Sequence, residues 1–262
     1  MAATDVPPEL RQAWKRFELI GRRWDYGQVF GDLLLMSLAQ CIKNDDIHAE
    51  HMNNMKKYDR KEKDLANEFF YYYLQCHLEQ TEKNRWFDFW GVLYECTVSR
   101  YKASNMGQFF TPPGMCEVLA QLTMGSELVE GKNISDPACG SGRILLSAWS
   151  NHPKNYYCGE DKDLICCRMA ALNMALHGVK GEVINHDSLA DPEGLVTGYR
   201  INYHPYYRIM QIPHVEVLTK PEQSRVCMIW RARREDNQEK VEKNIEPKNT
   251  PQSTETGQLT IF

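Results

Sequence analysis

Apolar residues recur every three or four positions through the first hundred residues of the chain. The apolar runs cover residues 10–21, 29–42 and 69–78. This spacing is typical of amphipathic helices and predicts four or five helices over residues 1–102. The aromatic residues at positions 69–73 have the composition of a base-stacking platform, but their helical spacing favours a place in the core.

Between residues 107 and 188 the pattern changes to short apolar runs, separated by glycine-containing turns and amphipathic stretches. Strands are expected at residues 133–137, 155–159 and 181–185, and helices at 143–149 and 163–177. A strand, glycine turn, helix, strand, helix and strand in succession predict a right-handed, parallel α/β unit.

The last third of the chain has a looser pattern. Apolar and polar positions alternate in residues 214–218 and 225–231, which predicts a β-hairpin around residues 219–224. Residues 233–256 contain few apolar side chains and many Glu, Lys, Asn, Gln and Thr, a composition typical of disorder. The whole pattern therefore predicts a helical part (1–102), an α/β core (103–232) and a disordered tail (233–262).

Composition narrows the class of protein. The chain has 262 residues, of which 42% are hydrophobic and 25% charged, as in ordinary soluble proteins. No apolar run approaches the ~20 residues of a membrane helix and no signal segment opens the sequence, so a cytoplasmic protein without a membrane partner is expected. A net charge of −4 excludes a strongly basic nucleic-acid wrapper, but it allows a DNA enzyme with a local positive surface. The nine cysteines form no C-x-x-C pair, which favours reduced thiols and predicts no metal site.

The most informative segment runs from Asp136 to Gly142 and reads Asp-Pro-Ala-Cys-Gly-Ser-Gly. It lies between a predicted strand and a predicted helix, where a glycine turn lets the backbone approach a ligand. Asp161 ends the next predicted strand, the position at which a carboxylate binds ribose hydroxyls in such folds. A ligand-free turn and a dinucleotide site are the alternatives. The dinucleotide is less consistent, because Ile144 and Leu145 stand where G-x-G-x-x-G has its third glycine. No base is placed for Cys139, so this thiol is interpreted as packing.

In their order along the chain these motifs resemble the N6-adenine DNA methyltransferases, in particular the modification subunit of type I restriction-modification systems. The similar segments are Gly107–Pro112, the glycine turn, Gly159 and Asp161 with Asn173 and His177-Gly178, Asp187–Leu189, and the lead-in Asp88–Glu95. The resemblance covers residues 85 to 190. It implies a class I S-adenosylmethionine-dependent methyltransferase (Rossmann-like) core after a helical N-terminal region, S-adenosylmethionine as cofactor, and adenine in DNA as substrate.

The resemblance also implies roles for individual residues at the cofactor. Contacts to the methionine end fall to Phe110, Thr111 and Pro112, and contacts to the amino-acid portion fall to Asp136, Gly140 and Gly142. Asp161 is implied at the ribose hydroxyls and Asp187 at the adenine ring, with Ser188 and Leu189 packed beside it. For Asp187 an exposed aspartate at a strand end is the alternative interpretation.

The family's catalytic tetrapeptide, Asn/Asp-Pro-Pro-Tyr/Phe, is absent from the sequence. In that motif two oxygens accept the hydrogens of the target amino group and the aromatic ring stacks on the flipped base. The nearest candidate is Tyr203-His204-Pro205-Tyr206. Its first residue is a weak substitute for Asn or Asp, Asn202 lies one residue out of register, and the buried strand expected before the motif is missing, so the core is interpreted as truncated.

Three hypotheses follow. The chain is an active site-specific adenine methyltransferase with an unusual catalytic loop, or a cofactor-binding subunit with weak or no catalysis, or an interaction protein that has lost the cofactor. The intact cofactor motifs argue against the third. The missing acceptors favour the second, in which the chain acts at DNA with a partner methyltransferase or specificity subunit.

The end of the chain carries a further motif. Gln258-Leu259-Thr260-Ile261-Phe262 resembles the pentapeptide by which bacterial replication and repair proteins bind the sliding clamp. The amide of Gln258 would form hydrogen bonds, while Leu259, Ile261 and Phe262 would fill an apolar cleft, with the preceding residues as a tether. The alternative is a frayed apolar terminus.

Overall fold

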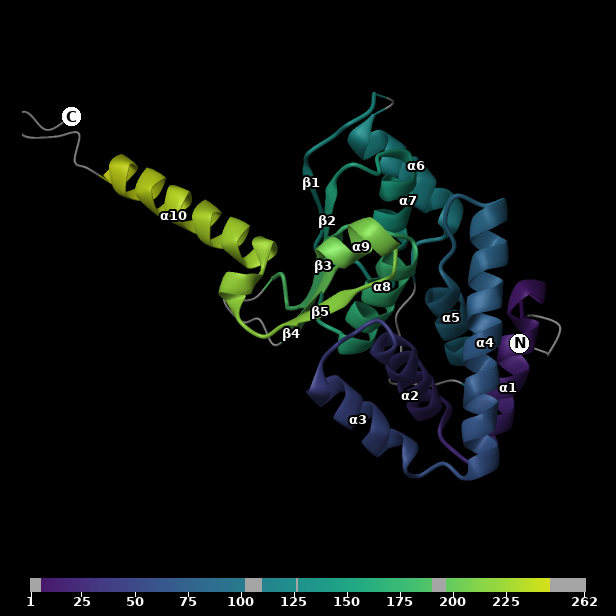
Figure 1. Ribbon diagram of the computed structural model, residues 1–262. Coiled ribbons are helices and arrows are strands. Elements are labelled where there is room, and N and C mark those ends of the chain that lie inside the picture. The colour runs from purple at the N-terminus through teal and green to yellow at the C-terminus, as the bar shows by residue number, and fades with distance from the viewer. Residues whose placement is uncertain (1–5, 102–109, 126, 190–196, 246–262) are drawn as a thin grey trace, which may run out of the picture.

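The computed structural model describes residues 6–101, 110–125, 127–189 and 197–245, and the statements below concern these residues. A bundle of helices from the N-terminal part packs beside an α/β part, and a long helix projects from the far side of the sheet (Figure 1).

Five α-helices form the N-terminal part, which confirms the four or five predicted. They are α1 (Arg11–Gly21), α2 (Tyr26–Ala39), α3 (Asp45–Met55), α4 (Arg60–Lys83) and α5 (Phe89–Tyr101), after a short 3-10 helix at Pro8–Leu10. The side chains of Asp25, Asn44 and Asp59 each accept a hydrogen bond from a backbone N–H in the first turn of the helix that follows. Such caps satisfy amide groups that have no partner inside the helix.

Aromatic side chains fill the junction of α4 and α5. Phe69 and Tyr73 are at most 1% exposed. The ring of Tyr73 lies 4.6 Å from that of Phe89 and 5.2 Å from that of Trp90, measured between centroids. The prediction that the aromatic run belongs to the core rather than to a base-stacking surface is confirmed for these two residues.

The α/β part contains the parallel unit expected from the sequence. Its elements are α6 (Pro113–Met124), β1 (Asn133–Asp136), α7 (Arg143–Asn151), β2 (Tyr156–Asp161), α8 (Leu164–Leu176) and β3 (Gly181–Asn185). The strands β1, β2 and β3 are parallel and lie side by side in chain order. Their carboxyl ends therefore meet at one end of the sheet.

Two antiparallel strands extend the sheet beyond β3. They are β4 (Thr197–Ile201) and β5 (Val215–Leu218), and α9 (Pro205–Met210) connects them. The prediction that no buried strand precedes Tyr203 is therefore wrong. Tyr199 and Ile201 are buried, and a Cβ on Gly198 would lie 3.0 Å from the Ile184 side chain. The buried positions of β4 thus include a glycine and a tyrosine instead of a run of aliphatic residues, which is why the sequence pattern did not reveal a buried strand.

The last element is α10 (Arg225–Ile245), which follows a 3-10 turn at Pro221–Gln223. The predicted hairpin is wrong in its second arm, because Val226, Cys227 and Trp230 pack on the sheet at helical spacing. The predicted disorder is also wrong up to residue 245, since the Arg, Glu, Lys and Gln of this segment are good helix formers. The boundary expected at residue 232 falls inside α10, and the rest of the predicted tail lies outside the described residues.

The two edges of the sheet differ. Beside β5, Ile42 forms a bridge to Val215, whose N–H donates to the Cys41 carbonyl at 2.8 Å. On the other side, β1 has no neighbouring strand within the part of the chain that is described, and Asn133 and Ser135 are exposed. Helices normally cover both faces of a parallel sheet, whereas an edge strand such as β1 leaves backbone N–H and C=O groups without a strand partner.

Candidate functional site

The predicted cofactor residues gather where β1 and β2 end. The glycine turn connects β1 to α7, and two of its glycines have positive φ, 52° at Gly140 and 87° at Gly142. A Cβ on Gly140 would lie 2.8 Å from the Phe110 ring, and one on Gly142 would lie 3.3 Å from the Cβ of Ala170. Both the backbone conformation and the close contacts therefore require glycine at these positions.

Asp161 joins the end of β2 to the glycine turn. Its Oδ2 accepts a hydrogen bond from the N–H of Gly140 at 3.0 Å, and its Oδ1 accepts one from the N–H of Asp163 at 2.9 Å. Each carboxylate oxygen can accept a second hydrogen bond. Asp161 therefore holds the turn in place and keeps acceptor capacity for a ligand hydroxyl.

Asp136 has an unsatisfied acceptor. Its Oδ1 accepts from the N–H of Ala138 at 3.1 Å, whereas its Oδ2 is buried and has no hydrogen-bond partner among the described residues. Burial raises the pKa of Asp136, the Ala138 N–H opposes this, and the neighbouring charge of Asp161 adds to it. A buried acceptor without a donor is unfavourable, which makes Asp136 Oδ2 a candidate partner for a ligand donor. Asp136 itself does not line the cavity beside the turn.

The segment at residues 110–112 closes the pocket from above the turn. The Phe110 ring lies 5.2 Å from the ring of Tyr94 and 5.4 Å from the Arg143 guanidinium, and Pro112 precedes the first turn of α6. A cavity of about 250 Å³ remains between this segment and the turn. It is lined by Phe110, Thr111, Ala138, Cys139, Gly140, Ser141, Arg143, Ile144 and Asp161.

The residues after β3 lie beside this pocket but do not line it. Ser188 Oγ donates to the carbonyl of Pro137 at 3.0 Å, which ties the end of β3 to the glycine turn. Asp187 Oδ1 accepts from the N–H of Leu189 at 3.1 Å, and the Leu189 side chain is 97% exposed. Leu189 thus has few contacts with the described residues, and its packing beside the cofactor stays a prediction.

Cys139 is a packing residue in the structure as well. Its side chain is buried, and burial raises the pKa of its thiol well above the ordinary value. All nine cysteines are free thiols. Within the described ranges no cluster of His, Cys, Asp or Glu side chains is placed to hold a metal ion.

Sequence reasoning missed the group that anchors the turn, the carboxylate of Asp88. Ser141 Oγ and Arg143 Nε each donate to Asp88 Oδ2 at 2.5 Å, and Asn173 Nδ2 donates to Oδ1 at 2.7 Å. The sequence pattern placed Asp88 in the lead-in Asp88–Glu95 that resembles the methyltransferase family, but it assigned no role to this carboxylate. Its partners are 53, 55 and 85 residues away, and only the spacing Asp-x-x-Gly before a helix hinted at a capping function.

Arg143 connects Asp88 to a second carboxylate, that of Glu95. Its Nη1 and Nη2 donate to the two Glu95 oxygens at 3.0 and 2.8 Å. Burial acts to lower the pKa of Arg143, but Asp88 and Glu95 outweigh it and the net effect raises the pKa. The side chain therefore stays charged inside the protein.

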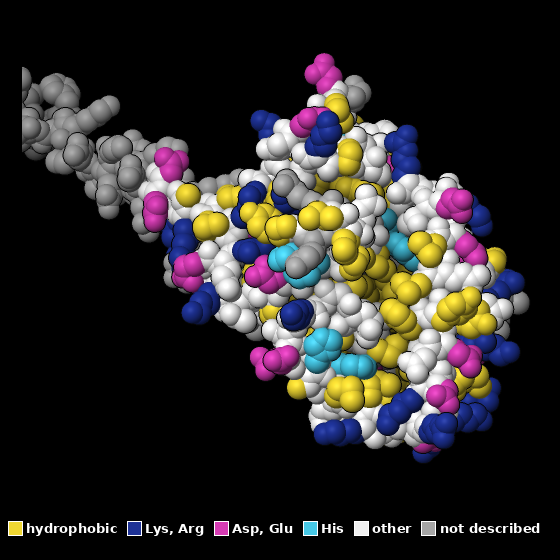
Figure 2. Space-filling model, in the orientation of Figure 1, with side chains coloured by type: hydrophobic (Ala, Val, Ile, Leu, Met, Phe, Trp, Pro, Cys, Tyr) yellow, Lys and Arg dark blue, Asp and Glu magenta, His cyan; other side chains and the backbone are white. Residues whose placement is uncertain are grey.

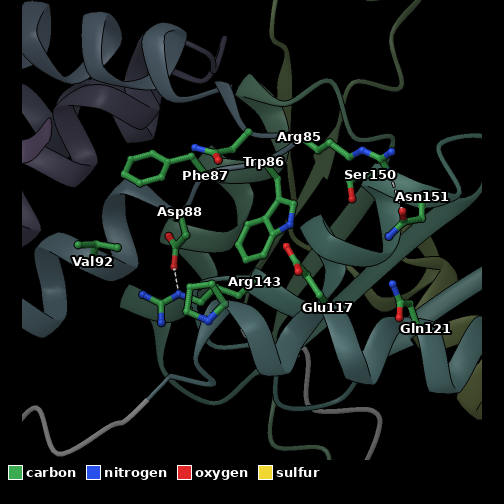
Figure 3. Close-up of a pocket in the computed structure, with 12 residues that line it drawn as sticks. Arg85, Trp86, Phe87, Asp88, Val92, Glu117, Gln121, Arg143, Ser150 and Asn151 are labelled. Carbon is green, nitrogen blue, oxygen red and sulfur yellow. Dashed lines mark hydrogen bonds and ion pairs between the residues drawn. The ribbon is translucent and has the colours of Figure 1, made fainter. Parts of the chain in front are cut away.

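A second cavity, of about 460 Å³, lies on the other side of Arg143 (Figure 3). The close-up shows Trp86 at its centre, with Glu117 and Gln121 reaching in from α6 and Asn151 from α7. None of the predicted cofactor residues lines it. Asp88 and Arg143 form its wall toward the glycine turn.

The structure does not bring Tyr203–Tyr206 to the glycine turn. Because β4 is antiparallel, it ends where β3 begins, with Ile201 opposite Gly181. The Tyr203 ring lies 5.0 Å from Lys180 Nζ at that end, and the His204 ring lies 5.1 Å from that of His214. Pro205 and Tyr206 begin α9, and the Tyr206 side chain lies outside the described residues.

Asn202 has a structural role in the same corner. Its Nδ2 donates to the carbonyls of Ala175 and Val179 at 3.0 Å, and its Oδ1 accepts from the N–H of His214 at 3.1 Å. Its φ of 52° is a conformation that asparagine adopts more readily than most residues. Asn202, Tyr203 and His204 make their contacts at this end of the sheet and not at the pocket. Among the described residues the structure therefore places no counterpart of Asn/Asp-Pro-Pro-Tyr/Phe there.

The glycine turn, the acidic end of β2 and the parallel order of β1 to β3 define a Rossmann-like α/β fold. A family model described as N-6 DNA Methylase matches residues 85–252, and the chain belongs to this family. The core is accordingly a class I methyltransferase fold preceded by helices, as the sequence predicted.

Individual relatives match the same part of the chain. It is 31% identical over 128 residues to the type I restriction enzyme MpnII methylase subunit of Mycoplasma pneumoniae, a match that covers 44% of this chain and 23% of that protein. The MjaVIII methylase subunit of Methanocaldococcus jannaschii is 29% identical over 115 residues, or 41% of this chain and 19% of that protein. The chain thus spans less than a quarter of the length of these curated relatives.

A solved structure is also similar. It is the methyltransferase subunit of a type I restriction-modification system from Streptococcus thermophilus, 24% identical, with 48% of this chain and 28% of that chain covered and a TM-score of 0.33.

Proposed function

We propose that the chain binds S-adenosylmethionine in the 250 Å³ pocket and acts at DNA in the cytoplasm. The lining of that pocket by Phe110, Gly140 and Asp161 carries this proposal. The unpartnered, buried Oδ2 of Asp136, at the strand end directly before the turn, supports it. An ammonium group, such as that of the cofactor's methionine end, would supply the missing donor. Asp161 would accept hydrogen bonds from the ribose hydroxyls, and Phe110 and Thr111 would close over the methionine end.

The bound cofactor would supply an electrophilic methyl group. The chain's own residues bind and orient it: Gly140 and Gly142 let the backbone approach, and Asp136 fixes the charged end. Phe110 excludes water from above the turn. Asp187 and Ser188, beside the pocket, remain proposed contacts to the adenine of the cofactor.

A second candidate function is that of a cofactor-binding subunit that needs a partner for catalysis. The position of Tyr203–Tyr206 at the opposite end of the sheet favours it, because the described residues then offer no pair of acceptors for a target amino group. The open edge of β1, directly before the glycine turn, is consistent with it. A partner methyltransferase or a specificity subunit would supply DNA contacts and the missing acceptors.

The face of the molecule shown in Figure 2 has no single positively charged patch that would mark a DNA-binding surface. On the face shown in Figure 2, Lys and Arg side chains are interspersed with Asp and Glu. In the described part of the chain no helix is both long and apolar enough to cross a bilayer.

Two measurements separate these functions. Isothermal titration calorimetry with S-adenosylmethionine tests the pocket, and transfer of tritiated methyl groups to unmethylated DNA tests catalysis. Binding with transfer indicates an active methyltransferase, and binding without transfer indicates the cofactor-binding subunit. Absence of both would leave an interaction protein and would refute the proposed pocket.

The sliding-clamp contact is a separate proposal, supported by sequence alone, because Gln258–Phe262 lies outside the described residues. A peptide of residues 253–262 is expected to bind a bacterial sliding clamp in fluorescence anisotropy. The same peptide with Gln258→Ala and Phe262→Ala is expected not to bind. Equal binding of the full-length protein with and without these two changes would refute the motif.

A further inference from the structure

One carboxylate outside the cofactor pocket, that of Asp88, accepts hydrogen bonds from four donors. Asp88 immediately precedes α5, and its Oδ1 accepts from the N–H of Gly91 at 2.8 Å, which caps that helix. Its side chain is 2% exposed. Four donors therefore converge on an almost fully buried carboxylate. Two of these donors are Ser141, in the glycine turn, and Arg143, the first residue of α7.

The contacts to the glycine turn hold both sides of it. Ser141 donates its hydroxyl to Asp88, while the Ser141 carbonyl accepts from Nδ2 of Asn173 at 2.9 Å. Asn173 in turn donates its other hydrogen bond to Asp88. Ser141 is fully buried and Asn173 is 2% exposed, so solvent cannot replace these bonds.

The backbone approach at this contact leaves no room for a side chain. A Cβ on Gly91 would overlap the Asp88 carboxylate and would lie 2.7 Å from Ser141 Oγ. The start of α5 is thus pressed against the turn. Figure 3 shows Asp88 and Arg143 pointing toward one another from α5 and α7.

We propose that Asp88 is a positioning residue for the cofactor pocket, through which the helical N-terminal part sets the conformation of Gly140–Gly142 and the direction of Arg143. Asp88 does not line the 250 Å³ cavity, whereas Ser141 and Arg143 do. This inference rests on the proposed function of that pocket. It implies that α5 belongs to the cofactor site although it contributes no ligand contact.

The test compares two buried carboxylates. Asp88→Asn keeps the shape of the side chain but removes its charge and one acceptor. Glu182→Gln is the matched control: Glu182 is fully buried and accepts from Tyr156, Ser224 and Val226 on the opposite face of the sheet. Both variants are expected to lower the melting temperature.

Only Asp88→Asn is expected to affect the pocket. Amide hydrogen exchange at Gly140 and Gly142, whose N–H groups donate to Asp161 Oδ2 and to the Cys139 carbonyl, should become at least tenfold faster. The dissociation constant of S-adenosylmethionine should rise at least tenfold. Glu182→Gln should change neither quantity.

The possible outcomes are distinguishable. If the unmodified chain does not bind S-adenosylmethionine, the proposed function fails, but the exchange rates still test the positioning role. If Asp88→Asn lowers only the melting temperature, as the control does, the positioning role is refuted. Should Asp88→Asn not fold, Asn173→Ala, which removes one donor to Asp88 and the bond to Ser141, is expected to give the same two changes at about threefold. No change in that variant also refutes the role.

Discussion

Three aspartates around one turn differ in what their oxygens contact. Asp88 is saturated by four donors, Asp161 accepts two backbone N–H groups, and Asp136 keeps one buried oxygen without a partner. The saturated carboxylate is suited to hold structure, and the unsaturated ones are suited to hold a ligand. Residue type alone does not distinguish these roles, since they depend on the donors that the fold brings to each side chain.

Replacing Asp161 by alanine is expected to weaken S-adenosylmethionine binding at least tenfold. The variant loses the acceptors for the ribose hydroxyls, and hydrogen bonds to a charged group contribute ~1.5–3 kcal/mol. Calorimetry measures the change, with Asp64→Ala, an exposed aspartate on α4, as control. An unchanged dissociation constant would remove Asp161 from the cofactor site.

His177 is expected to make stability depend on acid pH. The Phe87 N–H donates to its Nε2 at 3.1 Å, so the ring proton is on Nδ1, which lies 2.7 Å from the Asn173 carbonyl. Burial, together with His77, lowers the pKa of His177 to about 3. The unfolded chain, with an ordinary histidine pKa of about 6.5, binds a proton between these values that the native protein does not.

The contribution of neutral His177 to the free energy of unfolding is therefore fully present above pH 6.5, and it decreases as the pH falls toward 3. One such proton contributes a slope of up to about 1.4 kcal/mol per pH unit. Urea unfolding at pH 7, 5.5 and 4.5 measures it, and His177→Gln is expected to flatten the dependence. Identical slopes for both proteins would show that other groups cause the acid sensitivity.

At the scale of elements, the sequence predicted the segments whose pattern is local. Strands β1 and β2 end at aspartates, Asp136 and Asp161, and the glycine turn follows β1. The helices between the strands have regular apolar spacing. Two segments were mispredicted because their partners are distant. Residues 226 and 230 fit both an alternating and a helical pattern. The buried carboxylates Glu160 and Glu182, which accept hydrogen bonds from α10, cannot be recognised as its partners from sequence.

The packing of α10 on the sheet is expected to contribute to stability. Trp230 Nε1 donates to Glu160 at 3.2 Å, and its ring covers the cluster behind β2 and β3. A fully buried tryptophan contributes 3–5 kcal/mol relative to alanine, so the half-buried Trp230 should contribute about 2 kcal/mol. Chemical denaturation of Trp230→Ala measures this. Met228→Ala, at a position of α10 that is 48% exposed, should have little effect, and equal losses in both variants would contradict the packing.

At the scale of the whole molecule, the predicted cofactor residues and the predicted catalytic residues lie at opposite ends of the sheet. The pocket lies at the carboxyl ends of the parallel strands, and Tyr203–Tyr206 lies at the opposite end. Introducing Asn-Pro-Pro-Tyr at residues 203–206 is therefore expected not to raise methyl transfer to DNA, even in a protein that still binds cofactor. A tritium assay tests this, and a clear gain would show that these residues reach the pocket.

The helical part and the core cannot be treated as separate units. Besides Asp88 and Glu95, Glu50 of α3 accepts two hydrogen bonds from Arg168 of α8, at 2.9 and 3.0 Å. The division at residue 102 was placed where composition changes, whereas the contacts that matter for the pocket cross it. Composition shows where the proportions of apolar and polar residues change along the chain, but not which segments pack against each other.

The projection of α10 from the sheet has a practical consequence. Its 21 residues rise 1.5 Å each, so its end lies roughly 30 Å along the axis from Arg225. The helix projects away from the sheet (Figure 1), and Val226, Cys227 and Trp230 in its first turns pack on the core. A fluorophore or a fused protein attached at residue 245 would lie far from the glycine turn. The helix thus offers an attachment point, away from the proposed cofactor pocket, for distance measurements by resonance energy transfer.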